Sequence, residues 1–497
     1  MNTTSLAEQG GACRRAQFQW ARNSIRDRLP VVRRFRQSLV AARDRLGAAV
    51  QSEIGRAPAE TLAAEILPLA DACRFLELEA ARILKPRRAP LRRRPLWLWG
   101  QRDTIHRRPH GVVGIVGTWN YPLFLNGVQI AQALVAGNAV AWKPSEISTA
   151  SAPLLHQLFL DAGAPTELLQ MLPARREAGA ELVEADIDHL VFTGSAAVGR
   201  TIAARLGERL VSSTLELSGC DAMFVLADAD VELAARAAWF GATLNRGQTC
   251  IAVRRAFVHR SIYPAFIEQI AAKLAAAKPV TLVTPGQVQQ ADRLVADAQA
   301  KGGRVVNSFC RDAESSERNA LDSLTLASRL TAPRVIVDAT PEMAACREDC
   351  FAPLLAIVPF DSPGEALCMN AACRYGLSSS IFTADVRTGE DFASKLPAGS
   401  TCINDVIAPT AHPATPFGGR RQSGWGVTQG PDGLLAMTVP QVVSVRGGTF
   451  RPHYEPMNEP TQRLLTGLLA WRHAPRFADR WRGFWTMVSR GRRMEET

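Results

Sequence analysis

The sequence predicts an α/β protein whose strands form open, mostly parallel sheets. First, short apolar runs alternate with helical segments from Gly111 onward, as in repeated β/α units. Second, runs such as residues 112–116 are apolar throughout, which is typical of strands covered on both faces. Third, Asn120, Lys143 and Ser195 each follow such a strand, at the carboxyl ends where parallel sheets bind ligands. The length of 497 residues predicts two or three domains.

The chain begins with a predicted helical region, residues 14–84. Apolar residues recur there at spacings of three and four, the period of a helix buried on one face. Pro86 and Pro90 end the last helix, because proline has no backbone N–H and clashes with the preceding turn. Residues 92–110 are then expected to form an extended β-ribbon that leaves the domain body.

Two β/α series follow the ribbon. The first has expected strands at residues 112–116, 139–142, 168–172 and 189–192, and helices at 122–136, 150–162 and 200–206. The second starts near Met223, with expected helices at 231–242, 263–277 and 287–300 and strands at 334–337 and 442–445. Residues 307–328 are rich in serine and are expected to be variable.

The composition is that of a globular protein in a reducing compartment. Hydrophobic residues make up 47% of the chain and charged residues 21%. Ten cysteines without regular spacing predict free thiols and a cytoplasmic location. Neither a signal peptide nor an apolar run long enough to span a membrane is visible. No metal site is expected, because Cys346 and Cys350 lack a second Cys/His pair at ligand spacing.

The net charge of +11 is concentrated in two arginine-rich clusters, near residues 85–94 and 476–493. Such clusters can bind phosphate-bearing polymers or anionic lipid, or can be solvated faces. Nucleic-acid binding is a minor hypothesis, because no recognition module is visible. In the tail after Thr449, aromatic residues recur at helical spacing between arginines. Such a helix can lie on a membrane surface, dock on its own protein or contact a partner subunit.

Three polar residues suggest acyl chemistry. Cys250 follows a turn containing Gly247, Glu216 lies 34 positions upstream, and Asn120 lies further upstream. A thiol, a carboxylate and an amide can serve as nucleophile, base and oxyanion donor. A lone cysteine is more often a small buried hydrophobe, so the hypothesis depends on the three together.

The motifs around these residues occur in a diagnostic order. They are Trp119-Asn120-Tyr121-Pro122, Lys143-Pro144-Ser145-Glu146, Phe192-Thr193-Gly194-Ser195 with Gly199, Leu215-Glu216-Leu217, Gly247-Gln248-Thr249-Cys250, Phe351 with Pro353, and Pro416-Phe417-Gly418-Gly419. In this order the chain resembles the NAD(P)-dependent aldehyde dehydrogenase superfamily. Glu65-Ile66-Leu67-Pro68 and Cys73-Arg74-Phe75 resemble the branch that handles fatty and aromatic aldehydes, here with a C-terminal extension.

The resemblance implies two doubly wound parallel-sheet domains with a small β oligomerisation arm, and a homodimer, with a tetramer as the alternative. The expected parts are N-terminal helices (1–91), the arm (92–110 and 435–448), an NAD(P)-binding domain (111–219), a catalytic domain (220–434) and a basic aromatic tail (449–497).

The implied reaction oxidises an aldehyde, expected to be hydrophobic or aromatic, to a carboxylic acid. Cys250 would attack the aldehyde, and the Asn120 amide and Cys250 backbone N–H would bind the oxyanion. Glu216 would then activate water to hydrolyse the thioester. A free thiol has a pKa near 8.5, so Cys250 needs either a lowered pKa or a nearby base.

The expected cofactor is NAD, with NADP as the alternative. Gly194, Ser195 and Gly199 open a helix whose N-terminus suits a pyrophosphate, although an ordinary glycine turn would look the same. Lys143 and Glu146 resemble the pair that contacts the adenosine ribose, and Glu146 would repel a 2′-phosphate. The other expected cofactor-binding residues are Trp119, Ser145, Leu217, Asp349 and Phe351.

The sequence also departs from the family pattern. Asp349 stands where the family usually has glutamate, Ala352 and Ser218 where it has glycine, and Cys220 where lysine is frequent. These departures affect the predicted hold on the nicotinamide. The alternatives are a CoA-acylating dehydrogenase, which retention of Glu216 disfavours, and a catalytically silent binding or scaffold protein.

Overall fold

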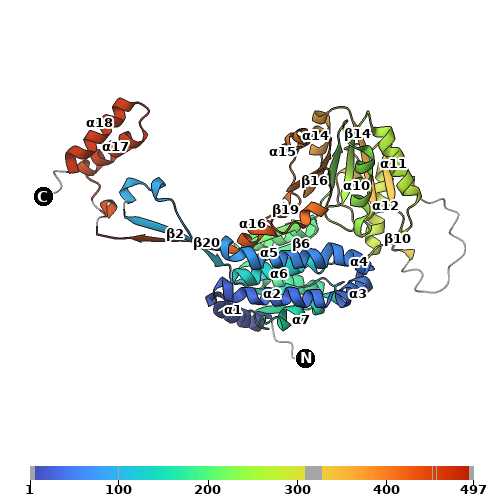
Figure 1. Ribbon diagram of the computed structural model, residues 1–497, viewed down its shortest axis with the longest axis horizontal. Coiled ribbons are helices and arrows are strands. Elements are labelled where there is room, and N and C mark those ends of the chain that lie inside the picture. Colours follow the sequence, from blue (N-terminus) through green and yellow to red (C-terminus); the bar gives the residue numbers. More distant parts are fainter. Residues whose placement is uncertain (1–5, 99, 308–326, 450, 455, 492–497) are drawn as a thin grey trace. The chain divides into compact units, whose positions relative to one another are not determined.

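The computed structural model describes residues 6–98, 100–307, 327–449, 451–454 and 456–491. The chain forms two compact units. The larger contains Met1–Lys85 with Arg107–Pro440, and the smaller contains Pro86–His106 with Gln441–Thr497. The predicted α/β class and parallel sheets are confirmed in the larger unit (Figure 1).

A six-stranded sheet carries the first β/α series. Its strand order is β19-β7-β6-β3-β4-β5, and every pair is parallel except β19 with β7. The strands are β3 (Val112–Val116), β4 (Ala139–Lys143), β5 (Leu169–Met171), β6 (His189–Gly194), β7 (Ser212–Leu217) and β19 (Gly424–Trp425). Strand β3 is almost completely buried, as its uninterrupted apolar sequence predicts.

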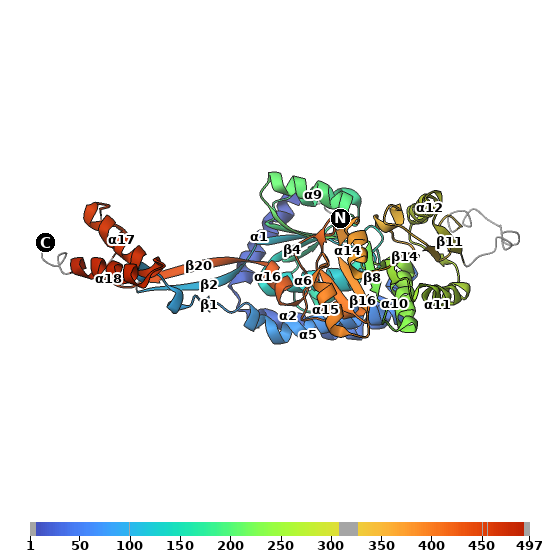
Figure 2. The ribbon, with the colours of Figure 1, turned by 90° about the horizontal axis from the view of Figure 1, so that it is seen from above.

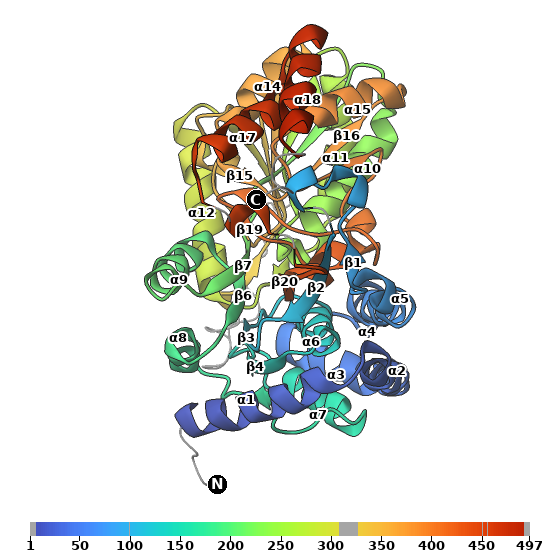
Figure 3. The same cartoon turned by 90° about the vertical axis from the view of Figure 1, so that its left-hand side faces the viewer.

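Helices cover both faces of this sheet (Figure 3). Helices α8 (Arg176–Glu184) and α9 (Ala196–Glu208) lie on one face, and α6 (Phe124–Ala136) lies on the other. Further helices are α1 (Leu6–Arg22), α2 (Ile25–Ala41), α3 (Arg43–Ile54), α4 (Pro58–Thr61), the π-helical turn η1 (Leu62–Ile66), α5 (Leu67–Ile83) and α7 (Ser151–Asp161). The predicted N-terminal helical region is therefore confirmed. The rings of Phe35 and Phe159 stack 3.6 Å apart between α2 and α7.

A seven-stranded sheet carries the second series, in the order β11-β13-β14-β9-β8-β16-β17. Only β11 is antiparallel to its neighbour. The strands are β8 (Asp221–Val225), β9 (Val253–His259), β11 (Arg304–Asn307), β13 (Arg334–Val337), β14 (Leu354–Phe360), β16 (Ser378–Phe382) and β17 (Ser400–Ile403). The side chains of β8 point alternately into two apolar cores, one on each face of the sheet.

The helices of this half are α10 (Val231–Thr243), α11 (Tyr263–Ala275), α12 (Pro285–Ala300), α14 (Pro363–Ala371) and α15 (Val386–Ser394). Helix α16 (Gly430–Ala436) instead packs against α5 and α6, in the core beside the six-stranded sheet. Small sheets pair β10 (Val280–Thr281) with β12 (Leu330–Thr331) and β15 (Tyr375–Gly376) with β18 (Arg420–Arg421). Most of the serine-rich segment that was expected to be variable, residues 308–326, lies outside the described residues.

The smaller unit contains a three-stranded sheet and two helices. The strands are β1 (Arg87–Arg88), β2 (Gln101–Pro109) and β20 (Thr438–Arg446), with β2 in the middle. The ribbon expected over residues 92–110 is wrong in its first part, where 3₁₀ turns form at Leu91–Arg93 and Leu96–Leu98. Each turn directly follows a proline, which cannot donate a ladder hydrogen bond. Among the described helices, none is both long enough and apolar enough to cross a bilayer.

Candidate active site

A cavity of about 940 Å³ opens at the carboxyl ends of β3, β4, β6 and β7. This position is where open α/β sheets bind ligands. Sequence-predicted residues that line the cavity are Trp119, Asn120, Lys143, Ser145, Glu146, Gly194, Ser195, Glu216, Leu217, Cys250, Asp349 and Phe351. The fold therefore brings together catalytic and cofactor candidates that lie up to 232 positions apart in the chain, from Trp119 to Phe351.

The backbone before Cys250 has an uncommon conformation. Asn245, Arg246 and Gly247 have φ angles of 51°, 59° and 74°, all in the left-handed region. A side chain at Gly247 would place its Cβ 2.4 Å from the carbonyl of Ala352, so only glycine fits there. Asn245 in this region keeps the Cys250 loop tight against its neighbours, because its side chain donates to the Gln248 carbonyl at 3.2 Å.

Two arginines, of which only Arg254 is buried, brace this loop. The Arg246 guanidinium donates to the carbonyls of Ile54 and Gly55. The Arg254 guanidinium, which is buried, donates to the Gly247 carbonyl and to the Ala352 carbonyl, the latter at 2.6 Å. Hydrogen bonds from a charged guanidinium to a carbonyl are stronger than those between neutral groups. They therefore offset the free-energy cost of the left-handed backbone.

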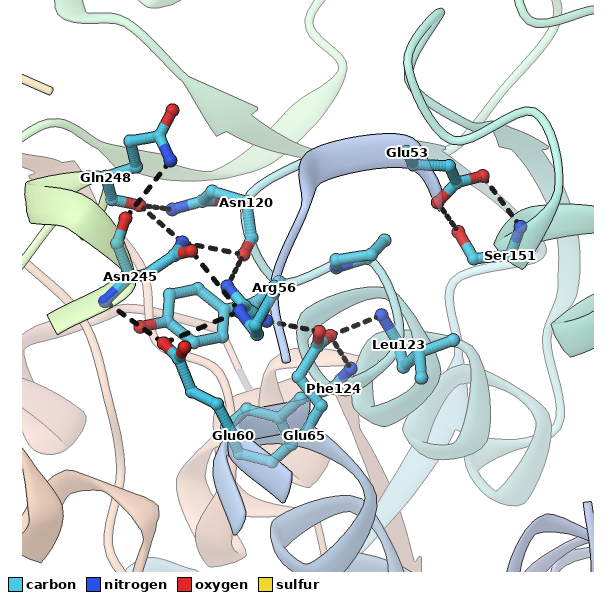
Figure 4. Close-up of polar contacts among 12 residues, drawn as sticks. Glu53, Arg56, Glu60, Glu65, Asn120, Leu123, Phe124, Ser151, Asn245 and Gln248 are labelled. Carbon is cyan, nitrogen blue, oxygen red and sulfur yellow. Dashed lines mark hydrogen bonds and ion pairs between the residues drawn. The ribbon is translucent and has the colours of Figure 1, made fainter. Parts of the chain in front are cut away.

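An ion pair with no solvent exposure holds Asn120 (Figure 4). Arg56 pairs with Glu65 and also donates to the backbone carbonyl of Asn120 and, at 3.3 Å, to Oδ1 of Asn245. The second oxygen of Glu65 accepts the backbone N–H groups of Leu123 and Phe124 at 2.7 and 3.2 Å. The same pair thus fixes both the Asn120 backbone and the N-terminal end of α6.

The Asn120 amide is held in one orientation. Its Oδ1 accepts the Thr118 hydroxyl at 2.6 Å, and its Nδ2 donates to the Gln248 carbonyl at 3.0 Å. An amide nitrogen carries two hydrogens, so the second hydrogen can bind an oxyanion formed beside Cys250.

The carboxyl group of Glu216 is buried, and few hydrogen bonds offset the cost of burying its charge. It lies near the end of β7 and is 6% exposed. Its Oε1 accepts the Thr428 hydroxyl at 3.4 Å, while Oε2 has no hydrogen-bond partner within the described ranges. Burial raises the pKa of Glu216 to about 8, despite the opposing hydrogen bond from Thr428. A carboxyl group with that pKa can exchange protons near neutral pH.

The surroundings of Cys250 favour the protonated form of its thiol. Burial raises the pKa of Cys250 to about 12, and the neighbouring carboxyl groups of Asp221 and Glu216 add to the rise. Burial also raises the pKa of Asp221 to about 7, although its carboxylate accepts the Ser378 hydroxyl at 2.6 Å. Of the two options that the sequence left open, a lowered thiol pKa and a nearby base, the second is the one that the geometry offers.

Other residues that line the cavity could hold a dinucleotide. Lys143 Nζ lies 2.7 Å from the Glu146 carboxylate, which is partly exposed at the cavity wall. Burial acts to raise the pKa of Glu146, but the hydrogen bond and charge of Lys143 outweigh it and lower the pKa. Ser195 caps the N-terminus of α9, accepting the Val198 N–H at 3.4 Å. A helix N-terminus beside a Lys–carboxylate pair fits a pyrophosphate and a ribose.

The comparisons with known proteins show which family the chain belongs to. The chain matches the Aldehyde dehydrogenase family over residues 5–443. It belongs to that family. A Methylomonas protein described as 4,4'-diapolycopene aldehyde oxidase is 32% identical over 88% of this chain and 80% of its own length.

Solved structures agree in fold. A Mycobacterium tuberculosis aldehyde dehydrogenase complexed with NAD+ is 27% identical, with a TM-score of 0.80 over 90% of this chain and 92% of that one. An NADP-dependent glyceraldehyde-3-phosphate dehydrogenase from Bacillus halodurans, complexed with NADP, is 26% identical, with a TM-score of 0.78 over 89% and 91%. This chain is therefore an NAD(P)-dependent enzyme of the aldehyde dehydrogenase family with the α/β fold of that family.

The four residues that depart from the family pattern lie in different surroundings. Asp349 lines the cavity, and its carboxylate accepts the Tyr375 hydroxyl at 3.2 Å. Ser218 also lines it, and its carbonyl accepts the Ser423 hydroxyl at 2.8 Å. Cys220 does not line it, because its sulfur points to the Ala345 carbonyl at 3.8 Å. Ala352 is buried and packs against Gly247. Of these four departures in this aldehyde dehydrogenase, only Asp349 and Ser218 therefore line the cavity.

Gly199 differs from the other cofactor candidates. It does not line the cavity, and a Cβ there would lie 2.5 Å from the Leu217 side chain. Its lack of a side chain lets α9 approach β7 closely. Within the described ranges, no group of three His, Cys, Asp or Glu side chains could hold a metal ion.

The residues that sequence reasoning missed are Arg56, Asn245, Arg254 and Asp221. The sequence did contain one indication of the left-handed backbone in the Cys250 loop. Asn245 lies two positions before Gly247, and asparagine and glycine both tolerate that conformation. Arginine is most often a surface residue, so nothing in the sequence marked Arg56 and Arg254 as buried.

Proposed function

We propose that the chain oxidises an aldehyde to a carboxylic acid through a thioester on Cys250. The observation that carries the proposal is that Cys250, Glu216 and Asn120 line one cavity, in which the thiol is protonated and Glu216 has a pKa of about 8. A buried carboxyl group that titrates near neutral pH is the base that such a thiol requires.

In the first step the Cys250 thiol loses its proton to the Glu216 carboxylate, directly or through a water, and the sulfur bonds to the aldehyde carbon. The second Asn120 hydrogen and the Cys250 backbone N–H bind the oxygen, which takes on the negative charge. NAD(P)+, when bound, supplies the acceptor for the hydride that leaves this carbon. The carbon–oxygen double bond re-forms, and the carbonyl carbon remains attached to sulfur as a thioester.

Before the second step Glu216 releases the first proton to solvent, so that it is a carboxylate again. Glu216 then takes a proton from water as the water oxygen bonds to the thioester carbon. The carbon–sulfur bond breaks, the carboxylic acid leaves, and the Cys250 sulfur takes up the proton that Glu216 holds. Asn120 serves the same oxygen in both steps. The arginine bracing of the Cys250 loop and the Arg56 contact to Asn120 keep the nucleophile and the oxyanion donor in fixed positions.

For the cofactor, Lys143 and Glu146 would hold the adenosine ribose, with Ser195 and Gly194 at the pyrophosphate. Glu146 favours NAD, because a carboxylate accepts from a free 2′-hydroxyl and repels a 2′-phosphate, and NADP is the alternative. Trp119, Ser145 and Leu217 would line the dinucleotide. Asp349 and Phe351 would lie at the nicotinamide end, where the Trp119 and Phe351 rings are 6.0 Å apart.

The expected substrate is a hydrophobic or aromatic aldehyde, in keeping with the fatty and aromatic branch and with the name of the Methylomonas relative. The expected assembly is a homodimer through β20, an edge strand that exposes Val442, Val443 and Val445. The expected location is cytoplasmic, which the free state of the described cysteines supports. Residues 449–497 are the candidate for peripheral membrane contact, and docking on a partner subunit is the competing assignment.

A CoA-acylating reaction and a silent scaffold are the other candidate functions. The retained, proton-exchanging Glu216 disfavours the first, since transfer to CoA does not require an activated water. The joint placement of Cys250, Glu216 and Asn120 disfavours the second.

The test is formation of NADH or NADPH by the purified protein with short, long-chain and aromatic aldehydes, with and without CoA. Cys250→Ala is the blank, and Cys402→Ala is a control for loss of a buried thiol away from the cavity. CoA-independent activity that is lost only in Cys250→Ala supports the proposal. Activity that survives in Cys250→Ala, or that requires CoA, contradicts it.

A further inference from the structure

Almost all of the chain's net charge lies in the smaller compact unit. From the sequence, Pro86–His106 and Gln441–Thr497 contain 16 arginines and six acidic residues, a net charge of +10 out of +11 for the whole chain. The larger unit, with the active site, is therefore close to neutral at +1. An arginine-rich composition spread over the whole protein would not produce this separation, so the charge marks a surface with its own partner.

Two helices of this unit pack against each other as a hairpin. Helices α17 (Glu459–His473) and α18 (Phe477–Gly491) lie side by side (Figure 2). They approach most closely at two glycines, because a Cβ at Gly483 would lie 2.5 Å from the Trp471 backbone nitrogen and 2.7 Å from the Gly467 carbonyl. The contact between the helices uses these glycines and the rings of Trp471 and Phe484, which are 5.7 Å apart, while other aromatic residues of α18 remain exposed.

Those large residues form an exposed aromatic stripe. Phe477, Trp481 and Trp485 recur every four positions along α18 and are 79%, 54% and 52% exposed. Their rings contact one another, with Trp481 6.4 Å from Phe477 and 5.9 Å from Trp485. At 100° per residue, Arg480 and Arg482 lie on opposite sides of this stripe. An aromatic stripe between cations is the pattern of a helix that lies in a membrane interface.

An apolar hollow lies in the same unit. Its volume is about 760 Å³, and its walls include Trp97, Met457, Leu465 and Leu469. These four side chains are each at least 45% exposed, so the hollow is open to a partner. The lining also includes Asn458, Gln462, Thr466, Arg472 and His473, so the hollow suits a hydrocarbon chain that carries a polar, anionic head.

We propose that the smaller unit docks peripherally on an anionic lipid bilayer. The aromatic stripe of α18 enters the interface, the flanking arginines bind headgroup phosphates, and acyl chains fill the hollow beside α17. The proposed dimer uses the edge of β20, so it leaves the aromatic stripe and the hollow for another occupant. A second copy is a poor occupant of the stripe, because its own arginines would face Arg480 and Arg482. A nucleic acid would match the charge but not the apolar hollow. The described helices cannot span a bilayer, so the contact is on its surface.

Docking also deepens the proposed function, because an apolar aldehyde dissolves in a bilayer and would be delivered close to the enzyme. Only this consequence rests on the proposed function. Bilayer binding itself is measured without catalysis, so the two can fail separately.

The experiment is co-sedimentation of the full-length protein with vesicles of phosphatidylcholine alone or with about 30% phosphatidylglycerol. We expect binding to the anionic vesicles only, reduced at least about 10-fold when the salt concentration rises from about 0.1 M to about 0.5 M. Arg476→Gln with Arg480→Gln and Arg482→Gln should lower the partition coefficient about 100-fold, at roughly a factor of five per arginine. Phe477→Ser with Trp481→Ser and Trp485→Ser should lower it at least about 10-fold.

Matched variants in the larger unit are the controls. Arg15→Gln with Arg22→Gln and Arg26→Gln removes the same charge from exposed helical positions, and Phe18→Ser removes an aromatic ring that is 64% exposed. Both should bind as the unaltered protein does, and all variants should retain turnover of a short soluble aldehyde. Three results overturn the proposal: no binding to anionic vesicles at low salt, equal binding by the stripe variants and the controls, or binding to duplex DNA or RNA without binding to vesicles.

Discussion

The buried pair of Arg56 and Glu65 gives the sharpest test of how the fold supports the site. Glu65→Gln keeps an oxygen that can accept the Leu123 and Phe124 N–H groups but leaves the guanidinium without its counter-charge. Removing one member of a buried ion pair costs about 3–5 kcal/mol. Arg56→Met leaves a carboxyl group whose pKa burial already raises, so it can take up a proton and lose its charge. In Glu65→Gln the Arg56 guanidinium cannot lose its charge in this way, because arginine stays protonated.

The two single variants should therefore differ. We expect Glu65→Gln to destabilise the protein by about 3–5 kcal/mol, and Arg56→Met by about 2–3 kcal/mol, the value of hydrogen bonds to a charged group. The double variant should cost at least about 1 kcal/mol less than the sum of the singles, because each single leaves a buried partner uncompensated. Urea-unfolding midpoints at one protein concentration measure these differences.

The activity of Arg56→Met separates positioning from mere stability. Arg56 donates to the Asn120 carbonyl, so its loss should lower kcat about 10–100-fold, less than direct loss of an oxyanion donor, with KM for NAD(P) unchanged. Arg36→Met is the matched control, since Arg36 pairs with the buried Glu77 at 2.6 Å between α2 and α5, away from the cavity. Equal kcat values for Arg56→Met and Arg36→Met, or fully additive stability effects in the double variant, would refute the reasoning.

The other predictions concern proton and cofactor chemistry. Because the ionised form of Glu216 is the base, kcat/KM should rise with pH and level off above about 8, and Glu216→Gln should lack that limb in a stopped-flow pH profile. The pKa of Glu216 in the folded protein lies above its ordinary value of 4.5, so the stability that this group contributes below pH 4.5 is lost as the pH rises through about 8. The melting temperature of Glu216→Gln should therefore rise relative to that of the unaltered protein from pH 6 to 9. A difference in melting temperature that stays the same over this range would contradict the burial argument. Asp349→Ala should raise the Kd of the cofactor about 10–100-fold by calorimetry while Asp349→Glu largely retains binding, whereas equal Kd values for Asp349→Ala and the unaltered protein would remove its cofactor role. Glu146→Gln should improve the NADP-to-NAD ratio of kcat/KM about 5–10-fold, and no change in that ratio would remove Glu146 from the ribose site.

The sequence was sufficient for the parts of the protein that follow from local periodicity and chain order. The uninterrupted apolar character of β3 and the position of Lys143 at the end of β4 predicted buried parallel strands with ligand groups at their carboxyl ends, and the structure has both. The start of the ribbon was predicted wrongly, because Pro90 and Pro95 each lead into a 3₁₀ turn before β2 begins at Gln101.

The parts that could not be predicted depend on contacts between distant segments. Arg56 reaches Asn120 and Asn245, which lie 64 and 189 positions away in the chain. The direction of the Cys250 pKa shift depends on burial and on Asp221, neither of which has a local sequence signal. Cys220 was one of the departures expected to affect the hold on the nicotinamide, but in the structure it does not line the cavity and its sulfur points to the Ala345 carbonyl.

The central claim is that the substrate passes through a thioester on Cys250 that Glu216-activated water hydrolyses. The most direct measurement is rapid quenching of Glu216→Gln with a reactive aldehyde and NAD+ at pH about 9, where hydroxide can remove the thiol proton, followed by peptide mass spectrometry. We predict that NADH formation slows after about one equivalent per active site and that the peptide containing Cys250 carries the acyl group. Continued NADH formation with an unmodified Cys250 peptide would contradict the account.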